Sequence, residues 1–340
     1  MRFAWYIVVG TVTAACAGPP PESPSSRDLA VEAETTSQRI AVWIDTDPSI
    51  RPGGYEVDDG FALIQAFRSA ELDVRGVSLV FGNAPLDLEI PIGQEIVRRF
   101  GPTGLGVYAG AAGPEELGEA TDASAALAEA LQREPLTILV LGPGTNIGTV
   151  LMRHPELADR MVELIAVAGR RPGQRFVTGE MTNSPFCDCN FDKDPESFQV
   201  MLDAGVSLTL TPWEISSHVW LRGEDLDRLE QGPAAARWLV PAARDWLGVW
   251  TSRFGVEGFN PFDTLAVGYL TSPGLITCDM LSAEIQSLPD DQAAMTGRAE
   301  VPDKPYLLAS RDLDADDHVR YCHTPADSFV GDLMQRLLSE

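Results

Sequence analysis

The chain has only two lysines, Lys193 and Lys304, among its 340 residues. Chemistry that needs a buried lysine, such as a Schiff base or an ammonium that clamps phosphate, therefore has few candidates. Basic residues are outnumbered by acidic ones, 25 against 50, and the formal net charge is −25 at pH 7. A surface this acidic repels phosphate backbones and anionic lipids, which argues against binding to nucleic acid or directly to a membrane. Cations and neutral molecules remain as partners.

The apolar run near the start of the chain, at residues 3–12, is too short to span a bilayer comfortably. It follows Arg2 and precedes Thr13-Ala14-Ala15-Cys16. Small residues before a cysteine resemble a bacterial lipoprotein signal, which predicts that residues 1–16 are a signal segment and that Cys16 is lipidated. Thr13 departs from that pattern, in which leucine is usual. An ordinary secretory signal, or an uncleaved anchor, is the alternative.

Residues 17–37 are rich in proline and serine, beginning with Gly18-Pro19-Pro20-Pro21. This composition predicts a flexible tether. The folded domain is expected at residues 38–340. We therefore expect a protein of the cell envelope, either periplasmic or an outer-membrane lipoprotein, that touches the membrane only through a lipid anchor, with secretion as the alternative.

Strand-like and helix-like segments alternate from residue 40 onward. Strand patterns lie at 40–44, 74–80, 136–141, 162–167, 207–211 and 284–288, and helical patterns at 58–68, 90–100, the stretch up to 153, 224–250 and 325–338. With 44% hydrophobic residues, the chain has the composition of a globular protein. The alternation predicts a single α/β domain, Rossmann-like, with a mostly parallel sheet flanked by helices. In such sheets the site lies at the carboxyl ends of the strands.

An acidic cluster follows the first predicted strand. Asp45 and Asp47 follow that strand, and Asp58 and Asp59 begin the next helix. Four carboxylates this close repel one another unless positive charge lies among them, and a hard divalent cation with oxygen ligands supplies it. The helix N-terminus contributes part of the compensation. Capping of the helix is the alternative role, but it explains only one of the four aspartates.

Several motifs, in order along the chain, resemble those of the nucleoside hydrolases, the inosine-uridine type enzymes that cleave N-ribosidic bonds. The first is Asp45-Thr46-Asp47-Pro48 followed by Asp58-Asp59-Gly60. The others are Val80-Phe81-Gly82-Asn83, Val107-Tyr108-Ala109-Gly110, Leu141-Gly142-Pro143-Gly144-Thr145-Asn146, Asp188-Cys189-Asn190 with Asp194-Pro195-Glu196, and Phe262-Asp263 with Leu265-Ala266-Val267. The resemblance covers the chain from about Gln38 to its end.

The resemblance implies a bound Ca²⁺ held by Asp47, Asp59, Asp263 and the main-chain carbonyl of Leu141. Asp45 would support these ligands without touching the ion. Asp47 would take the proton of a water that attacks the anomeric carbon, releasing free base and ribose. The substrate would be a small-molecule nucleoside, which suits purine salvage, and homo-oligomers are common in the family. The residues implied to bind substrate are Asp58, Asn83, Asn183, Asp188, Asn190 and Phe262.

Four departures from the family pattern bear on specificity. The segment 48–57 is about seven residues longer than the family's loop, and is either a solvated excursion or a source of substrate contacts from Arg51 and Tyr55. Asp188 replaces a glutamate, which shortens its reach to the sugar. Phe262 stands where the family has a histidine or a stacking tryptophan, which favours stacking on a purine-like base. Arg170 would place a cation near the site or on its rim.

The proton donor to the leaving base is left open by the sequence. His218 and His323 are candidates, and the alternatives are a polar loop residue and the end of a strand, respectively. Trp213, Trp220 and Trp250 either line the base pocket or belong to the core.

The cysteines beyond Cys16 allow two disulfides or free buried thiols. They are Cys187, Cys189, Cys278 and Cys322. A bridge between Cys187 and Cys189 themselves is disfavoured by their close spacing, and a zinc site made from this pair is improbable.

Two other functions compete with hydrolysis of nucleosides. A strand that ends in Asp45 and Asp47 also describes haloacid-dehalogenase-like phosphatases, but neither lysine lies in the context that those enzymes need. A non-catalytic, calcium-dependent surface lipoprotein that binds ribosides is the stronger alternative, because of the departures at Phe262, Asp188 and the loop.

Overall fold

The computed structural model describes residues 1–2, 4–5, 10, 39–180, 185–296 and 300–340. Cys16, most of the predicted signal segment, the predicted tether 17–37 and Asn183 lie outside the described residues. Residues 39–340 form one compact unit.

Nine strands form one sheet within the described part of the chain, in the order β3-β2-β1-β4-β5-β6-β9-β7-β8. From β3 to β9 each neighbouring pair is parallel, and β7 runs antiparallel to both β9 and β8. The predicted α/β fold with a mostly parallel sheet is confirmed. The strands are β1 (Ile40–Thr46), β2 (Leu72–Leu79), β3 (Val107–Ala109), β4 (Leu136–Val140), β5 (Met161–Ala166), β6 (Leu208–Leu210), β7 (Ile276–Pro289), β8 (Asp303–Ser310) and β9 (His318–Pro325).

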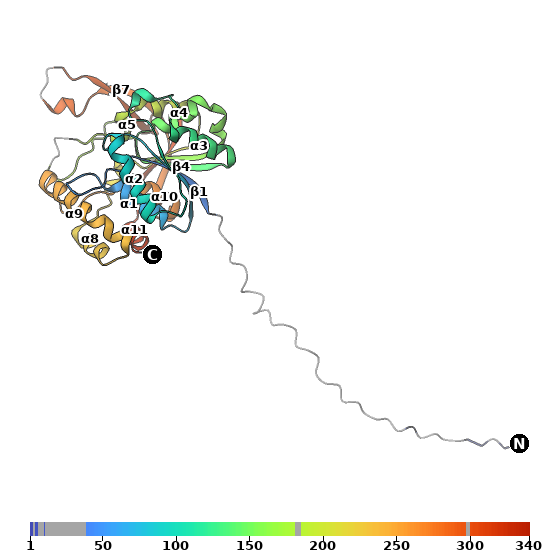
Figure 1. The fold of residues 1–340 in the computed structure, drawn as a ribbon. Helices are drawn as coiled ribbons and strands as arrows, with labels where there is room; N and C mark the ends of the chain where they lie inside the picture. Colours follow the sequence, from blue (N-terminus) through green and yellow to red (C-terminus); the bar gives the residue numbers. More distant parts are fainter. Residues whose placement is uncertain (3, 6–9, 11–38, 181–184, 297–299) are drawn as a thin grey trace. The chain divides into compact units, whose positions relative to one another are not determined.

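Helices cover both faces of this sheet (Figure 1). One face carries α1 (Asp58–Phe67), α2 (Leu86–Phe100), α8 (Gly223–Glu230), α9 (Ala234–Phe254), α10 (Thr264–Thr271) and α11 (Phe329–Leu337), and the other carries α3 (Asp122–Arg133), α4 (Thr145–Arg153) and α6 (Pro195–Asp203). Two short helices, α5 (Cys189–Lys193) and α7 (Trp213–Ser216), follow the strands β5 and β6. Short 3₁₀ turns lie at Pro114–Glu116, Pro155–Arg160, Pro273–Leu275 and Ala293–Thr296.

Strand β1 shows why a continuous apolar run forms the centre of the sheet. Side chains alternate between the two faces of a strand, so a strand covered on both faces must be apolar at every position. Val42 and Ile44 enter the core on the α1 side, and Trp43 enters the core on the α3 side. The indole nitrogen of Trp43 donates to Oγ of Ser78 on β2 at 2.8 Å, which satisfies its one buried polar atom.

The long helix predicted at residues 224–250 is wrong as a single element. The structure ends α8 at Glu230 and starts α9 at Ala234, with Pro233 at its N-cap. Proline has no N–H to donate and fits where a helix begins, so it divides a pattern that is amphipathic throughout. The last helix likewise begins at Phe329 instead of residue 325, because β9 extends to Pro325.

The site is positioned where β1 and β4 lie side by side. The chain leaves β1 for β2 on one side and β4 for β5 on the other, so the strand order reverses between β1 and β4. Open α/β sheets bind ligands in the crevice at such a reversal, at the carboxyl ends of the strands. Asp47 directly follows β1 and Leu141 directly follows β4.

Two disulfides are present among the described residues, Cys187–Cys189 and Cys278–Cys322. The first corrects the expectation that these two neighbours do not pair, since their Cα atoms lie 4.7 Å apart, within the range that a disulfide spans. The second ties β7 to β9, where Cys278 and Cys322 are opposite each other in the register.

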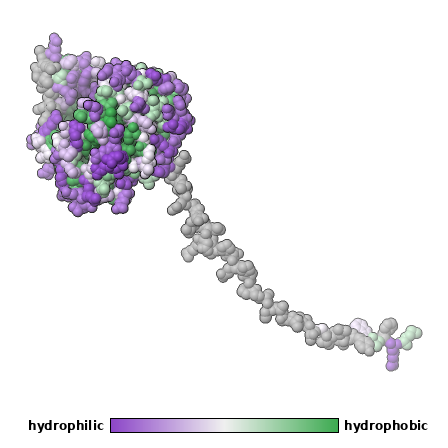
Figure 2. Space-filling view, viewed as in Figure 1, coloured by the Kyte–Doolittle hydropathy of each residue, from purple (hydrophilic) through white to green (hydrophobic). Residues whose placement is uncertain are grey.

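The surface of the unit is mainly hydrophilic in the view of Figure 2, with hydrophobic side chains in small groups. Of the helices in the described residues, none is both long and apolar enough to cross a membrane.

Candidate active site

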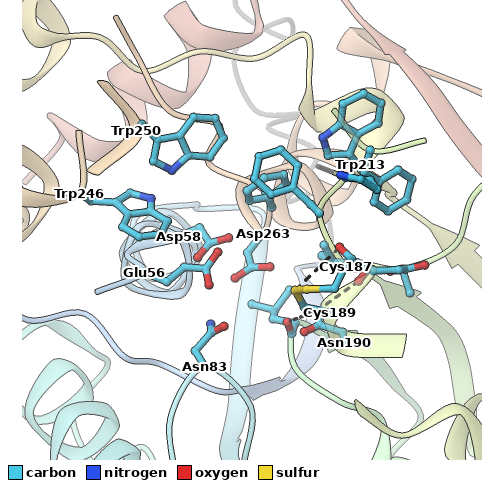
Figure 3. Close-up of a pocket in the computed structure, with 18 of the residues that line it drawn as sticks. Glu56, Asp58, Asn83, Cys187, Cys189, Asn190, Trp213, Trp246, Trp250 and Asp263 are labelled. Atoms are coloured by element: carbon cyan, nitrogen blue, oxygen red, sulfur yellow. Dashed lines mark hydrogen bonds between the residues drawn. A yellow bond between two sulfur atoms is a disulfide. The ribbon is translucent and has the colours of Figure 1, made fainter. Parts of the chain in front are cut away.

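A cavity of about 290 Å³ opens at the carboxyl ends of the central strands. Its floor carries carboxylates and amides, and its upper wall is aromatic (Figure 3). The lining residues include the polar Glu56, Asp58, Asn83, Asp188, Asn190, Arg253, Asp263 and Gln292, and the aromatic Phe176, Phe186, Trp213, Trp246, Trp250, Phe254 and Phe262.

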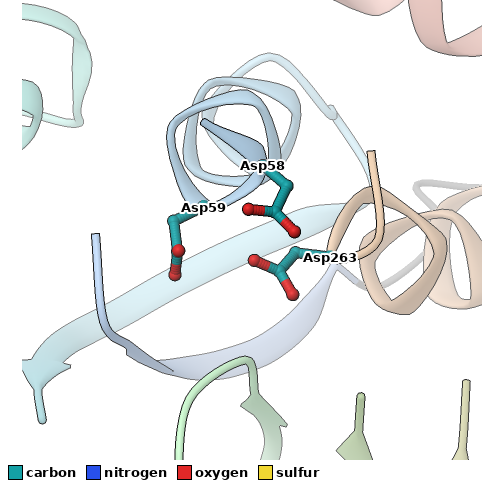
Figure 4. A group of neighbouring side chains, drawn as sticks. All are labelled: Asp58, Asp59 and Asp263. Atoms are coloured by element: carbon teal, nitrogen blue, oxygen red, sulfur yellow. The ribbon is translucent and has the colours of Figure 1, made fainter. Parts of the chain in front are cut away.

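Three aspartates at the base of the cavity, two of which line it, form a group that can hold a metal ion. Oxygen atoms of Asp58, Asp59 and Asp263 all lie within 4.8 Å of one another, and all three residues are buried (Figure 4). Asp58 and Asp59 occupy the first turn of α1, and Asp263 is the N-cap residue of α10. The fold therefore joins two predicted ligands, Asp59 and Asp263, with Asp58, which the sequence assigned to the sugar.

Asp47 lies beside this group. Its backbone N–H donates to Oδ1 of Asp59 at 3.1 Å, and its own Oδ2 accepts from the backbone N–H of Asn83 at 2.8 Å. Two glycines make room for its carboxylate: a Cβ at Gly82 would lie 1.8 Å from Oδ2 of Asp47, and one at Gly142 would lie 3.0 Å from Oδ1. Residue 82 must therefore be glycine for the carboxylate of Asp47 to approach this closely, which explains why glycine precedes Asn83 in the motif.

The site is built for more positive charge than the described side chains supply. Burial, followed by repulsion from Asp59, raises the pKa of Asp47 well above its usual value. Burial, followed by repulsion from neighbouring carboxylates, does the same to the pKa of Asp58 and of Asp263. Oδ1 of Asp47 and Oδ1 of Asp58 are buried with no hydrogen-bond partner among the described residues. Crowded, unpartnered carboxylate oxygens are the donor set that Ca²⁺ prefers, so the residues present fit this ion.

Asn83 is fixed between β2 and α2. Its side-chain Nδ2 donates to Oδ2 of Asp59 at 3.1 Å. The turn that carries it is held by Glu89, whose Oε1 accepts from the backbone N–H of Ala84 at 2.7 Å. Glu89 is fully buried, and burial raises its pKa to about 8. Glu89 was not predicted as part of the site, because one glutamate in a helical pattern carries no signal.

Asp188 and Asn190 line the side of the cavity near β5. Oδ2 of Asp188 accepts from the backbone N–H of Gly169 at 2.8 Å, and burial raises the pKa of Asp188 to about 7 against the opposing effect of Arg170. Nδ2 of Asn190 donates to the carbonyl of Leu141 at 2.6 Å and to that of Val167 at 3.2 Å. The carbonyl predicted to bind metal therefore also accepts a hydrogen bond from a predicted sugar contact.

Helix α9 contributes three of the seven aromatic side chains that line the cavity. Trp250 lies at its centre, with ring centroids 6.2 Å from Phe262, 6.0 Å from Phe186 and 6.3 Å from Trp246. The structure places Phe262 in the cavity, as predicted for a base-stacking residue, together with Trp213 and Trp250. Trp220 is not among the lining residues. It packs against Trp250, with the two ring centroids 5.9 Å apart.

The two histidines do not reach the cavity. Neither His218 nor His323 is among its lining residues in the described chain. His218 is exposed after α7, and Nε2 of His323 lies 3.7 Å from Asp279 on β7. Among the described residues, no histidine lines the cavity.

Arg170 and the long loop have structural partners. Arg170 is 2% exposed, pairs with Asp291 at 3.0 Å and stacks over the ring of Phe176 at 4.1 Å. The guanidinium of Arg51 lies 3.6 Å from the ring centroid of Tyr55, and neither residue is among those lining the cavity.

Glu56 and Trp246 line the cavity and were missed by the sequence analysis. Burial raises the pKa of Glu56 to about 7, with Lys193 opposing and Asp59 adding to the shift. The position of Glu56, two residues before Asp58, is the available signal, but the expected substrate contacts of this loop were Arg51 and Tyr55. Trp246 was hidden in an amphipathic helix, where an aromatic residue usually belongs to the core.

Comparisons with known proteins identify a family and a shared fold. The sequence profile described as inosine-uridine preferring nucleoside hydrolase matches residues 42–318. Uridine nucleosidase 1 of Arabidopsis thaliana is 27% identical over 261 residues, which cover 66% of this chain and 72% of that protein.

Two solved structures share the fold. The plant nucleoside hydrolase PpNRh1 superposes with a TM-score of 0.73 at 19% identity, covering 88% of this chain and 99% of that one. The purine-preferring ribonucleoside hydrolase of Gardnerella vaginalis superposes with a TM-score of 0.68 at 16% identity, covering 87% and 98%.

Proposed function

The chain belongs to the inosine-uridine preferring nucleoside hydrolase family, and from this premise we propose that it hydrolyses the N-glycosidic bond of ribonucleosides with the help of bound Ca²⁺. The observation that carries the proposal is the group of Asp58, Asp59 and Asp263 beside the unpartnered Oδ1 of Asp47, at the floor of a cavity that fits a small molecule. When bound, the ion supplies a fixed positive charge that orients a water and the sugar hydroxyls.

Asp47 is the base in this proposal. Its Oδ2 is fixed by the backbone of Asn83, and its Oδ1 is left to accept the proton of the attacking water. Asp47, Asp59, Asp263 and the carbonyl of Leu141 would hold the ion, and Asp58, which the fold groups with Asp59 and Asp263, is a further ligand in this proposal. The carboxylates beneath the sugar stabilise the positive charge that develops on it as the bond to the base breaks.

The sugar is held by side chains that the fold already orients. Asn83 is fixed by Asp59, Asn190 by the ends of β4 and β5, and Asp188 by the backbone of Gly169. The aglycone lies against Phe262 and Trp250, which favours an aromatic base of purine-like size. Asn183 lies outside the described residues and is kept in the set only because the family resemblance implies it.

The location is proposed from the sequence alone. Cys16 and residues 1–16 support a lipoprotein of the cell envelope, with secretion as the alternative, so that base and ribose are released outside the cytoplasm. We also propose that the protein assembles into a homo-oligomer, because homo-oligomers are common in the family.

The test is release of reducing sugar from a panel of purine and pyrimidine ribosides by the protein, with added Ca²⁺ and again after chelation. The proposal predicts release that chelation stops and that Ca²⁺ restores. Binding of ribosides without release would instead indicate the non-catalytic binding protein.

A further inference from the structure

The loop between Asp47 and Asp58 puts an additional carboxylate into the cavity. The loop is held at three points: Oγ of Ser49 donates to the carbonyl of Glu56 at 3.2 Å, the backbone N–H of Gly53 donates to Oδ2 of Asp245 on α9 at 2.8 Å, and Ile50 is buried at 3% exposure. The segment is therefore packed on α9 as part of the domain. Its last residues carry Glu56 to the cavity, beside Asp58 and below Trp246 in the view of Figure 3.

Acidic groups strongly outnumber basic groups in the lining of the cavity. Among the described lining residues, four carboxylates face a single guanidinium: Glu56, Asp58, Asp188 and Asp263 against Arg253. Arg253 is exposed at the rim, with its guanidinium 5.2 Å from the ring of Phe254. A bound Ca²⁺ would offset the charge of Asp58, Asp59 and Asp263. Asp188 is partnered by the backbone N–H of Gly169 and by the positive charge of Arg170. Lys193 is the cation that acts on Glu56, and it also acts on Asp47 and Asp59, so its charge is shared.

Seven aromatic side chains complete the lining of the described cavity, three of them tryptophans. The face of an aromatic ring is electronegative, and tryptophan attracts a cation most strongly. A carboxylate beside an aromatic wall is the combination that proteins use to recognise organic cations, because the rings bind the apolar body and the carboxylate complements the charge.

The cavity also lacks the usual proton donor. A neutral base leaves poorly unless a group protonates it, yet no histidine is among the described lining residues. An aglycone that is already cationic at the glycosidic nitrogen does not need this proton. The bond from C1′ to nitrogen breaks, its electron pair goes to the nitrogen and cancels the positive charge, and the aglycone leaves neutral. The attacking water supplies the new oxygen on C1′ and gives its proton to Asp47.

We infer that this cavity favours ribosides whose aromatic aglycone carries a fixed positive charge, such as a pyridinium or an N-alkylated purine, with Glu56 and Trp246 as the residues that select the charge. The inference rests on the proposed function for the assignment of this cavity to the aglycone. The charge selection itself is a binding property and is measurable without turnover.

The binding test uses two probes of nearly the same shape, the 1-methylnicotinamide cation and neutral nicotinamide, titrated calorimetrically into the Ca²⁺-saturated protein. We expect the cation to bind at least about 10-fold more tightly than the neutral probe. Glu56→Gln should reduce this ratio to about 3-fold or less, and Trp246→Leu should also lower it. Glu129→Gln, which makes the same change on the exposed face of α3, is the matched control and should leave the ratio unchanged.

Equal affinity for the two probes, tighter binding of nicotinamide, or no measurable binding of the cation overturns the inference. So does a ratio that Glu56→Gln does not change. A parallel assay compares kcat/KM for a pyridinium riboside with those for inosine and uridine, and we expect the pyridinium riboside to have the highest value. Hydrolysis of inosine or uridine in preference to the cationic riboside overturns the inference and leaves the proposed function standing. Selective binding of the cation with no hydrolysis of any riboside overturns the proposed function instead.

Discussion

Asn146 at the start of α4 donates through Nδ2 to Oδ1 of Asp45 at the end of β1, at 2.8 Å, although the two residues are 101 positions apart in the sequence. The same oxygen accepts a hydrogen bond from Oγ of Ser78 on β2. Oδ1 of Asn146 accepts from the backbone N–H of Ala111 at 3.0 Å. Asp45 is fully buried and thus joins the ends of β1 and β2 to α4 directly behind Asp47.

Asn146→Ala should destabilise the protein by about 1–3 kcal/mol, because it leaves a buried backbone N–H at Ala111 and a buried carboxyl oxygen at Asp45 without this partner. The free energy of unfolding in urea measures the effect. Gln199→Ala removes a comparable amide from the exposed face of α6, where it bonds Asp203, and serves as the control. Equal stability of the two variants would contradict a supporting role for Asn146.

Ca²⁺ should raise the melting temperature, since an ion that binds only the folded protein stabilises it by about 2.7 kcal/mol at 100 times its dissociation constant. Asp263→Asn removes a charge from the group of three aspartates and should abolish most of this shift. Asp314→Asn, at an exposed position, should retain it. Differential scanning calorimetry measures the melting temperature of each variant with and without Ca²⁺. If Asp263→Asn shows the same Ca²⁺-dependent increase as the parent protein, Asp263 does not bind the metal.

Glu89 predicts a pH dependence of stability. Burial raises the pKa of Glu89 from 4.5 to about 8 in the folded protein, so the folded state holds a proton that the unfolded state releases as pH rises above 4.5. Its contribution to stability is complete below pH 4.5 and is lost as the pH rises toward 8. The side chain of Glu89→Gln cannot titrate. The free energy of unfolding of this variant, minus that of the parent protein, should therefore increase as the pH rises across this window, by at most about 1.4 kcal/mol per pH unit.

Urea unfolding at several pH values measures the difference between the two proteins. Glu95→Gln on the same helix, where Glu95 forms a surface pair with Arg99, is the control and should show a much flatter difference. If the difference in unfolding free energy between Glu89→Gln and the parent protein does not change between pH 5 and 8, the pKa of Glu89 is not raised in the folded protein.

The Cys278–Cys322 disulfide should contribute stability without affecting activity. It closes a segment of 44 residues between β7 and β9, and neither cysteine is among the residues lining the cavity. Replacing both cysteines with alanine should cost about 2–4 kcal/mol in the free energy of unfolding. The double variant should keep the kcat/KM of the parent at 25 °C. A loss of activity in the folded variant would show that β7 and β9 act on the site.

The sequence predicted the parallel part of the sheet because apolar strands followed by helices give a clear pattern, as at β1, β2 and β4. It predicted the position of the cluster, since Asp47, Asp58 and Asp59 are near one another in the chain. It could not place Glu56, because whether a loop residue faces solvent or a cavity depends on the packing of that loop against α9. Pro233 is a sequence signal for the start of α9, but the amphipathic pattern continues on both sides of it and therefore predicts a single helix. The Cys187–Cys189 pairing depends on the local turn of the backbone, which spacing alone does not determine.

The most direct test of the account is the hydrolysis rate of Asp47→Asn in saturating Ca²⁺, measured in single turnover with the best riboside of the panel. If Asp47 takes the proton of the attacking water, the variant should lose about 10²–10⁴-fold in rate while it still binds the riboside. A variant that hydrolyses the riboside at the rate of the parent protein would contradict the central claim.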